Sequence, residues 1–264
     1  MSGLARRSRD TPTRTKNLQL ETRNPKLSSV SIAQNLDAIH SRIADAASRC
    51  GRSPRNIQLV AVSKTFPPGT IREAYAAGQR LFGENRVQEF DSKALALADL
   101  PDLEVHMIGH LQSNKSRKAV ELFQAVDSLD SVRLGNQLNA AAVERNKVVP
   151  VLIEINTGGE EAKSGLPIDW TEIEPVLAAA QGWSNLRVSG LMTVPPFTDD
   201  PEDARPYFRN LRDLRDEIAS KNLPAISMET LSMGMSHDFE VAIEEGSTCV
   251  RVGTAIFGVR AYPR

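Results

Sequence analysis

Residues 57–65 read IQLVAVSKT, an apolar run that ends in a single lysine, Lys64. Continuous stretches of Val, Leu and Ile of this length are typical of parallel strands that are buried on both faces. Seven similar runs follow along the chain, so the sequence predicts eight strands. These strands are expected at residues 57–63, 80–83, 104–108, 125–128, 150–156, 187–192, 227–231 and 248–252.

Longer amphipathic segments separate these runs and are predicted to be crossover helices. They cover residues 69–78, 86–99, 114–123, 131–147, 168–180, 202–221 and 237–245, and a further helix is predicted ahead of the first strand, at residues 31–49. Eight βα units within 264 residues favour a closed barrel over an open doubly wound sheet. We therefore expect an α/β fold, a single (β/α)8 TIM-type barrel with a leading N-terminal helix, as one domain over residues 30–264.

The first 29 residues differ in composition from the rest of the chain. They carry seven Lys or Arg residues against Asp10 and Glu21, and they show no apolar periodicity. Such a segment cannot bury enough apolar surface to fold alone, so we expect a disordered basic tail over residues 1–29. A solvated arm is the ordinary interpretation of this composition. A transit peptide, which is also rich in Arg and Ser and poor in acids, is the alternative.

Composition and charge argue against several classes of function. The formal net charge is −1, whereas binding to nucleic acid or to an acidic membrane normally needs a concentrated basic surface. No apolar run approaches the ~20 residues that cross a bilayer. We therefore expect neither nucleic acid nor a membrane as partner. The two cysteines, Cys50 and Cys249, stand far apart and fit a reducing compartment, with the cytoplasm as the default.

The single lysine at the end of the first strand is the first candidate site residue. In a barrel of this kind, ligands bind at the carboxyl ends of the strands, where Lys64 stands. A lysine is costly to desolvate unless it is paired, neutralised or covalently modified. Lys64 is therefore expected either to bend out to solvent or to react with a ligand.

Two glycine-containing loops follow the seventh and eighth strands. They read LSMGMS at residues 231–236 and VGTAIFG at residues 252–258. Glycine beside Ser or Thr lets backbone N–H groups and hydroxyls approach an anion, and these two loops are the recurrent phosphate position of such barrels. Together with Lys64, they predict one ligand that bears both an aldehyde and a phosphate.

Other side chains at the strand ends have two interpretations each. Arg251 either pairs with a carboxylate inside the barrel or reaches a pyridine nitrogen, where its permanent charge would weaken the ring as an electron sink. Asn85 either touches the ligand or caps a helix. His110 is either an acid–base group or a hydrogen-bonded loop histidine. Met192 packs in the core or against the ligand ring, and Lys163 either approaches the site or is solvated. Neither metal-ligand spacing nor a nucleophile–base motif surrounds them, so no metal is expected.

Six ordered motifs carry a resemblance to a known family. They are AVSKTFP around Lys64, FGENRVQE, HMIGHLQSNK, AKSGL, SGLMTVPP and LSMGMSHDFEVAIEEGSTCVRVGTAIFG. Over about residues 31–260 the chain closely resembles the pyridoxal phosphate homeostasis proteins. The resemblance implies a fold like the N-terminal barrel of alanine racemase, known as PLP fold type III, with pyridoxal 5'-phosphate (PLP) as the cofactor. The chain departs from the family at Asn85-Arg86, where a tyrosine often follows the asparagine.

The resemblance also implies the residues that bind the cofactor. Lys64 matches the lysine that forms the Schiff base, Arg251 would face the pyridine nitrogen, and Ser232, Gly253 and Thr254 would line the phosphate site. The full set expected to bind PLP is Lys64, Asn85, Met192, Ser232, Met233, Gly234, Arg251, Gly253 and Thr254. The resemblance further implies that the chain is a PLP carrier, or a regulator of vitamin B6 and amino-acid balance, without established catalysis. Apo PLP-dependent enzymes are then the expected partners.

Two other functions remain open. A PLP-dependent amino-acid racemase needs an acid–base group on each face of the substrate α-carbon, and alanine racemases supply the second from a C-terminal domain across a dimer. Because the sequence ends at Arg264, directly after its eighth βα unit, we expect a monomer without robust catalysis. His110, Lys163 or Tyr207 would have to replace that base. A barrel that binds another phosphorylated metabolite would keep the two loops but leave Lys64 unexplained.

Overall fold

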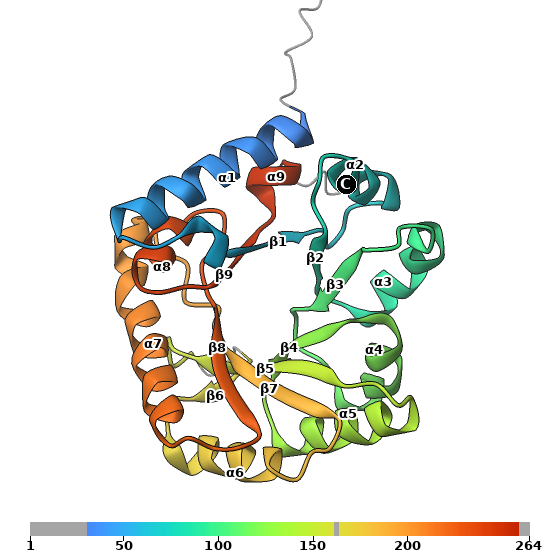
Figure 1. Cartoon of the computed structure of the whole chain (residues 1–264), viewed down its shortest axis with the longest axis vertical. Helices are drawn as coiled ribbons and strands as arrows, with labels where there is room; N and C mark the ends of the chain where they lie inside the picture. The colour runs from blue at the N-terminus through green and yellow to red at the C-terminus, as the bar shows by residue number, and fades with distance from the viewer. Residues whose placement is uncertain (1–30, 161–163, 259–264) are drawn as a thin grey trace, which may run out of the picture. The chain divides into compact units, whose positions relative to one another are not determined.

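The structure, a computed structural model, describes residues 31–160 and 164–258 and shows a closed barrel of eight parallel strands surrounded by helices (Figure 1). The barrel strands are β1 (Gln58–Val62), β2 (Leu81–Glu84), β3 (Glu104–Met107), β4 (Ala125–Leu129), β5 (Val149–Asn156), β7 (Leu186–Met192), β8 (Ile226–Ser232) and β9 (Cys249–Val252). Each strand pairs with the next in this order, and β9 pairs with β1, which closes the barrel. A short extra strand, β6 (Leu166–Pro167), pairs with β5.

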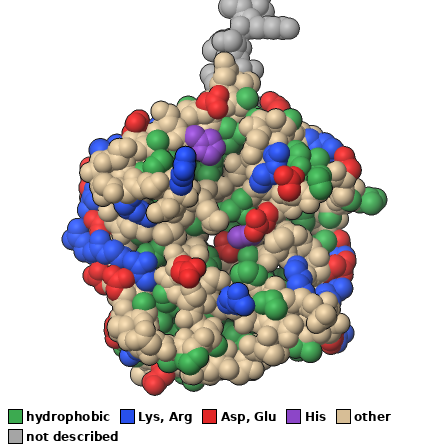
Figure 2. Space-filling model, in the orientation of Figure 1, with side chains coloured by type: hydrophobic (Ala, Val, Ile, Leu, Met, Phe, Trp, Pro, Cys, Tyr) green, Lys and Arg blue, Asp and Glu red, His purple; other side chains and the backbone are tan. Residues whose placement is uncertain are grey.

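Helices follow the strands around the outside of the barrel. They are α1 (Ile32–Arg49), α2 (Pro68–Ala76), α3 (Val87–Ala94), α4 (Ser116–Leu122), α5 (Val132–Glu144), α6 (Trp170–Ala180), α7 (Arg205–Ser220), α8 (Phe239–Glu244) and α9 (Thr254–Phe257). None of the helices in the described ranges is long and apolar enough to cross a membrane. On the face shown in Figure 2, basic and acidic side chains lie interspersed over the surrounding elements.

The leading helix α1 packs against the last helices of the chain, as Figure 1 shows for α9. It begins at a capping box, in which Ser31 Oγ accepts a hydrogen bond from Gln34 N–H and Gln34 Oε1 accepts one from Ser31 N–H. This arrangement satisfies backbone donors that a helix start leaves unpaired. Its apolar stripe, which includes Leu36, Ile39 and Ile43, is buried in the main core between barrel and helices. Helix α1 thus covers the part of the barrel where the first and last strands meet.

Alternation along the strands separates this outer core from the barrel interior. In β9, Val250 and Val252 belong to the outer core, while Arg251 points the other way and lines a cavity. Arg251 is only 3% exposed, so a charged side chain lies inside the barrel. The alternation of β9 therefore places one cation where the strand ends converge.

The predicted fold class is confirmed, and all eight predicted strands occur with ends within two residues of those expected. The helices differ more, both at their ends and at their starts. The helix expected over residues 86–99 ends at Ala94 and is followed by a 3-10 turn over Leu95–Leu97. The helix expected from residue 168 begins at Trp170, because Asp169 caps it by accepting a hydrogen bond from Thr171 N–H. The helix expected from residue 202 opens as a 3-10 turn over Pro201–Ala204 before α7 starts. The predicted tail, residues 1–29, lies outside the described residues.

Candidate functional site

A cavity of about 520 Å³ lies where the carboxyl ends of the barrel strands converge. Residues from β1, β2, β3, β5, β7, β8 and β9, or from the loops that follow them, form its wall. They are Val62, Lys64, Asn85, Ile108, Gly109, His110, Glu154, Ser164, Val194, Phe197, Met235, Ser236, His237, Arg251, Gly253 and Thr254. The cavity therefore brings together five of the nine residues predicted to bind the cofactor, namely Lys64, Asn85, Arg251, Gly253 and Thr254.

Lys64 is half-buried and follows β1 by two residues. Carboxylates hold its neighbours on both sides. Ser63 Oγ donates to Glu84 Oε1 at 2.7 Å, and Thr65 N–H donates to Glu89 Oε1 at 2.5 Å. Thr65 has a φ of +69°, a left-handed conformation that β-branched residues rarely adopt. The backbone on either side of Lys64 is therefore fixed by specific contacts.

Lys93 of α3 joins these two carboxylates. Its Nζ lies 3.1 Å from Glu84 Oε1 and 2.7 Å from Glu89 Oε1, and its side chain is only 8% exposed. Burial raises the pKa of Glu84, although the Lys93 charge opposes this effect. Burial acts in the same direction on Glu89, but hydrogen bonds from Lys93 and from Thr65 N–H bring the pKa of Glu89 below its usual value. Glu89 and Lys93 stand four residues apart on α3, but no sequence pattern indicated that Glu84 completes this ion triad.

The loops after β8 and β9 meet at Ser236. Its Oγ accepts hydrogen bonds from Gly253 N–H at 3.2 Å and from Ala255 N–H at 3.5 Å. Ser236, Gly253 and Thr254 all line the cavity, so the two predicted anion-binding loops are adjacent. Ser236 was not among the predicted site residues. Its position in the same Ser-Met-Gly-Met-Ser run was the signal that could have identified it.

Arg251 is held in the barrel interior by two hydrogen bonds. Its NH1 donates to Ser232 Oγ and its NH2 to the Thr193 carbonyl oxygen, each at 2.7 Å. Across residues 31–160 and 164–258 no carboxylate forms a salt bridge with it. The interpretation that Arg251 pairs with a carboxylate inside the barrel is therefore wrong. The guanidinium reaches the cavity with its position fixed by neutral partners.

The other four predicted cofactor residues do not line the cavity. Met192, Ser232 and Met233 are completely buried. Gly234 has a φ of +96°, and a Cβ there would lie 2.6 Å from the Ala242 Cβ. Glycine at this position thus allows the loop after β8 to pack against α8.

Asn85 and His110 lie in the cavity wall. Asn85 precedes Arg86, the residue at the start of α3, and no side chain caps that helix, so the capping interpretation of Asn85 is wrong. Its backbone packs on Gly109, where a Cβ would lie 2.6 Å from the Asn85 carbonyl oxygen. His110 Nδ1 lies 3.0 Å from Asp130 Oδ2, which confirms the hydrogen-bonded histidine. Tyr207 of α7 does not line the cavity, and Lys163 lies outside the described residues.

Glu154, near the end of β5, is a cavity residue that the sequence interpretation missed. It is 7% exposed, and its Oε2 is the single buried side-chain N or O atom without a hydrogen-bond partner in the described part of the chain. Burial raises the pKa of Glu154 to about 7; Asp130 adds to the rise, while Arg251 and His110 oppose it. A glutamate inside the apolar run VLIEI, residues 151–155, was the available signal.

Cysteine and metal chemistry have little support in the described ranges. Cys50 and Cys249 are both free cysteines, without a disulfide bond. Burial raises the pKa of Cys249 to about 12, so its side chain stays a neutral thiol at neutral pH. No group of three or more His, Cys, Asp or Glu residues in these ranges is placed to hold a metal ion.

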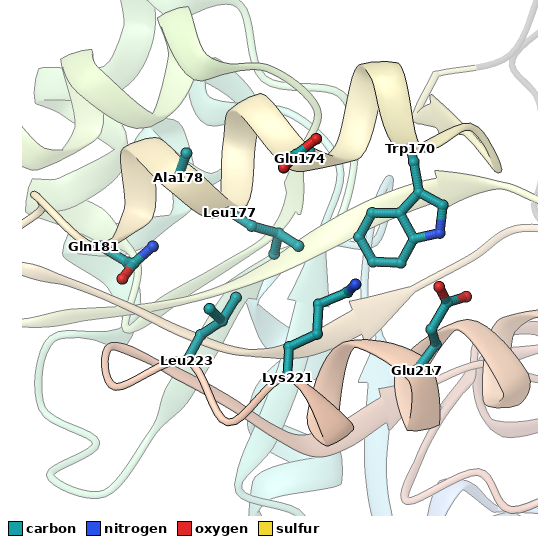
Figure 3. A pocket seen from close by; sticks show the side chains of 8 residues that line it. All are labelled: Trp170, Glu174, Leu177, Ala178, Gln181, Glu217, Lys221 and Leu223. Carbon is teal, nitrogen blue, oxygen red and sulfur yellow. The ribbon is translucent and has the colours of Figure 1, made fainter.

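A second hollow, of about 350 Å³, lies between α6 and α7 on the outside of the barrel (Figure 3). The Lys221 Nζ lies 4.2 Å from the centroid of the Trp170 ring, so a cation–π contact engages its charge. None of the predicted cofactor residues lines this hollow. The cavity at the strand ends is therefore the candidate site.

Comparison with known proteins gives a consistent result. The family described as the alanine racemase N-terminal domain matches residues 34–261. The chain is 46% identical to the pyridoxal phosphate homeostasis protein of Aquifex aeolicus over 229 residues, which are 87% of this chain and 98% of that protein. The structure of PipY from Synechococcus elongatus with PLP bound matches with a TM-score of 0.75 and 37% identity, covering 86% of this chain and 100% of that chain. The alanine racemase of Streptomyces coelicolor matches with a TM-score of 0.62 and 22% identity, and the match covers 85% of this chain and 59% of that chain. At this level of identity the two proteins share the fold alone.

Proposed function

Because the chain belongs to the family of pyridoxal phosphate homeostasis proteins, built on the alanine racemase N-terminal barrel, we propose that it binds PLP and serves vitamin B6 homeostasis. One observation carries the proposal. Lys64, Arg251 and the two loops joined at Ser236 line a single cavity at the strand ends. PipY, a relative that is matched over its whole length, has been solved with PLP bound.

The residues of this cavity fit PLP by their chemistry. When bound, PLP supplies an aldehyde that condenses with a primary amine to a Schiff base. Lys64 offers that amine, and the hydroxyls of Ser236 and Thr254 with the N–H groups of their loops offer hydrogen bonds to a phosphate. Arg251 offers a fixed cation to the ring nitrogen. A volume of about 520 Å³ also falls in the usual range for small-molecule sites.

The proposed role is to hold and pass on PLP without robust catalysis. A guanidinium is always charged, so Arg251 at the ring nitrogen would keep that nitrogen unprotonated and the ring a weak electron sink. The site then retains the cofactor but does little to stabilise a carbanion. Apo PLP-dependent enzymes are the proposed recipients. A monomeric state and a cytoplasmic location are part of the same proposal.

A second candidate function is that of an amino-acid racemase, favoured by one observation. His110 lies in the cavity wall and is hydrogen-bonded to Asp130, so it could act as an acid–base group in addition to Lys64. Of the three residues considered for that role, His110 is the one that the described cavity contains.

One experiment separates the two functions. The PLP-loaded protein is incubated with an apo aminotransferase, and separately with L-alanine in deuterated water. The carrier function predicts that the aminotransferase regains activity and that NMR shows no α-proton exchange above that of free PLP. Exchange that is lost in both Lys64→Ala and His110→Ala, but kept in the control Tyr207→Phe, would establish the racemase instead.

A further inference from the structure

The unpartnered oxygen of Glu154 identifies a second part of the cavity. Buried polar atoms in folded proteins are nearly always hydrogen-bonded, and each exception needs an explanation. Glu154 Oε2 is buried without a partner while the residue lines the cavity. When Glu154 is ionised, its carboxylate only accepts hydrogen bonds, so the partner that the ionised form needs is a donor.

The barrel places this carboxyl group across the cavity from Lys64. Glu154 belongs to β5 and Lys64 follows β1, and these two strands are separated by three others in either direction around the barrel. The groups suited to PLP, namely Arg251, Gly253 and Thr254, belong to β9 and to the start of α9 directly after it, beside β1. The side chain of Glu154 therefore lies on the side of the cavity away from the expected cofactor lysine.

Two acidic groups on this side, Glu154 and Asp130, attract a cation, while the Arg251 and His110 charges oppose that attraction. His110 Nδ1 is hydrogen-bonded to Asp130 Oδ2, and Asp130 raises the pKa of Glu154 as a second negative charge close to it. PLP presents mainly acceptor atoms, on its phosphate, phenolic and carbonyl oxygens, and these cannot satisfy a carboxylate. An ammonium group brings three donors and a positive charge.

We propose that Glu154, supported by the His110–Asp130 pair, binds the ammonium group of a small primary amine in this cavity, opposite Lys64 and beside PLP. This inference rests on the proposed function, because the bound amine would replace Lys64 on the cofactor. Its ammonium group would first give one proton to Glu154. Its nitrogen would then bond to the carbonyl carbon of PLP, and the bond from that carbon to Lys64 Nζ would break as Lys64 takes a second proton from the incoming nitrogen. The charged groups that act on Glu154 are Asp130, His110 and Arg251, and Lys64 lies across the cavity. A carboxyl group whose pKa is near 7 ionises readily when a cation binds beside it.

Stopped-flow release of the cofactor by ethylamine tests the inference. The absorbance of lysine-bound PLP is followed at pH 7.5 in the wild type and in Glu154→Gln, with Glu144→Gln, an exposed glutamate on α5, as the matched control. Binding before reaction predicts a rate that saturates with ethylamine in the wild type and in Glu144→Gln. Glu154→Gln should lose saturation and react at least tenfold more slowly at low ethylamine concentration.

Hydroxylamine separates amine binding from a general effect on the cofactor. It is neutral at this pH and needs no ammonium site, so its rates should agree within about twofold for all three proteins. A linear dependence on ethylamine in the wild type, or an equal slowing of hydroxylamine and ethylamine in Glu154→Gln, would overturn the inference. A protein with no lysine-bound PLP absorbance would overturn the proposed function, and this inference with it.

Discussion

Arg251 NH1 donates a hydrogen bond to Ser232 Oγ at 2.7 Å inside the barrel. Ser232 was expected at the phosphate, yet it is completely buried and does not line the cavity, whereas Thr254 does. We infer that Ser232 acts on the ligand through the orientation of Arg251. Ser232 should then affect binding of the pyridine ring, through Arg251, whereas Thr254 should affect binding of the phosphate.

The first prediction concerns this difference. Ser232→Ala should weaken binding of PLP and of pyridoxal, which lacks the phosphate, by a similar ~1–2 kcal/mol, because both ligands meet the same guanidinium. Thr254→Val should weaken PLP by ~1–3 kcal/mol and leave pyridoxal nearly unchanged, because a hydrogen bond to a charged group is lost. Dissociation constants from absorbance titrations measure both effects. A Ser232→Ala variant that discriminates between the ligands as Thr254→Val does would place Ser232 at the phosphate after all.

The second prediction concerns the ion triad behind Lys64. Lys93→Met leaves the buried carboxylate of Glu84 without its charge partner, and breaking a buried pair in this way costs about 3–5 kcal/mol of unfolding free energy. Lys118→Met is the control, because Lys118 pairs with Asp91 and Glu121 at the surface and such pairs contribute about 0–1 kcal/mol. Urea unfolding compares the two variants. Equal, small losses would show that the triad does not stabilise the loop that carries Lys64.

The third prediction concerns stability as a function of pH. The pKa of Glu154 is about 7 in the folded protein against a usual value of 4.5, so folding favours its protonated form. The stability it contributes is fully present below pH 4.5 and is lost as the pH rises through 7. Glu154→Gln removes this dependence. Between pH 5.5 and 8.5 the variant should therefore gain about 2 kcal/mol relative to the wild type in urea unfolding without PLP. A constant difference across this range would contradict the shifted pKa.

The sequence predicted the barrel well because each strand is a local apolar run, as in residues 57–63, which needs no knowledge of distant residues. It also predicted Lys64 and Arg251 in the cavity, because a charge in an apolar strand is visible locally. Side chains whose position depends on a distant partner were not predictable in this way. Lys93 of α3 reaches Glu84 of β2 through tertiary packing, and Ser236 binds N–H groups of a segment that begins 17 residues later.

The assignment of the cavity as the PLP site is tested most directly by identifying the lysine that carries the cofactor. Borohydride reduction of the PLP-loaded protein fixes the label, and mass spectrometry of the peptides locates it. We expect the pyridoxyl label on Lys64 and its loss in Lys64→Arg. A label on another lysine, or one that persists at an equal level in Lys64→Arg, would contradict the assignment of this cavity as the PLP site.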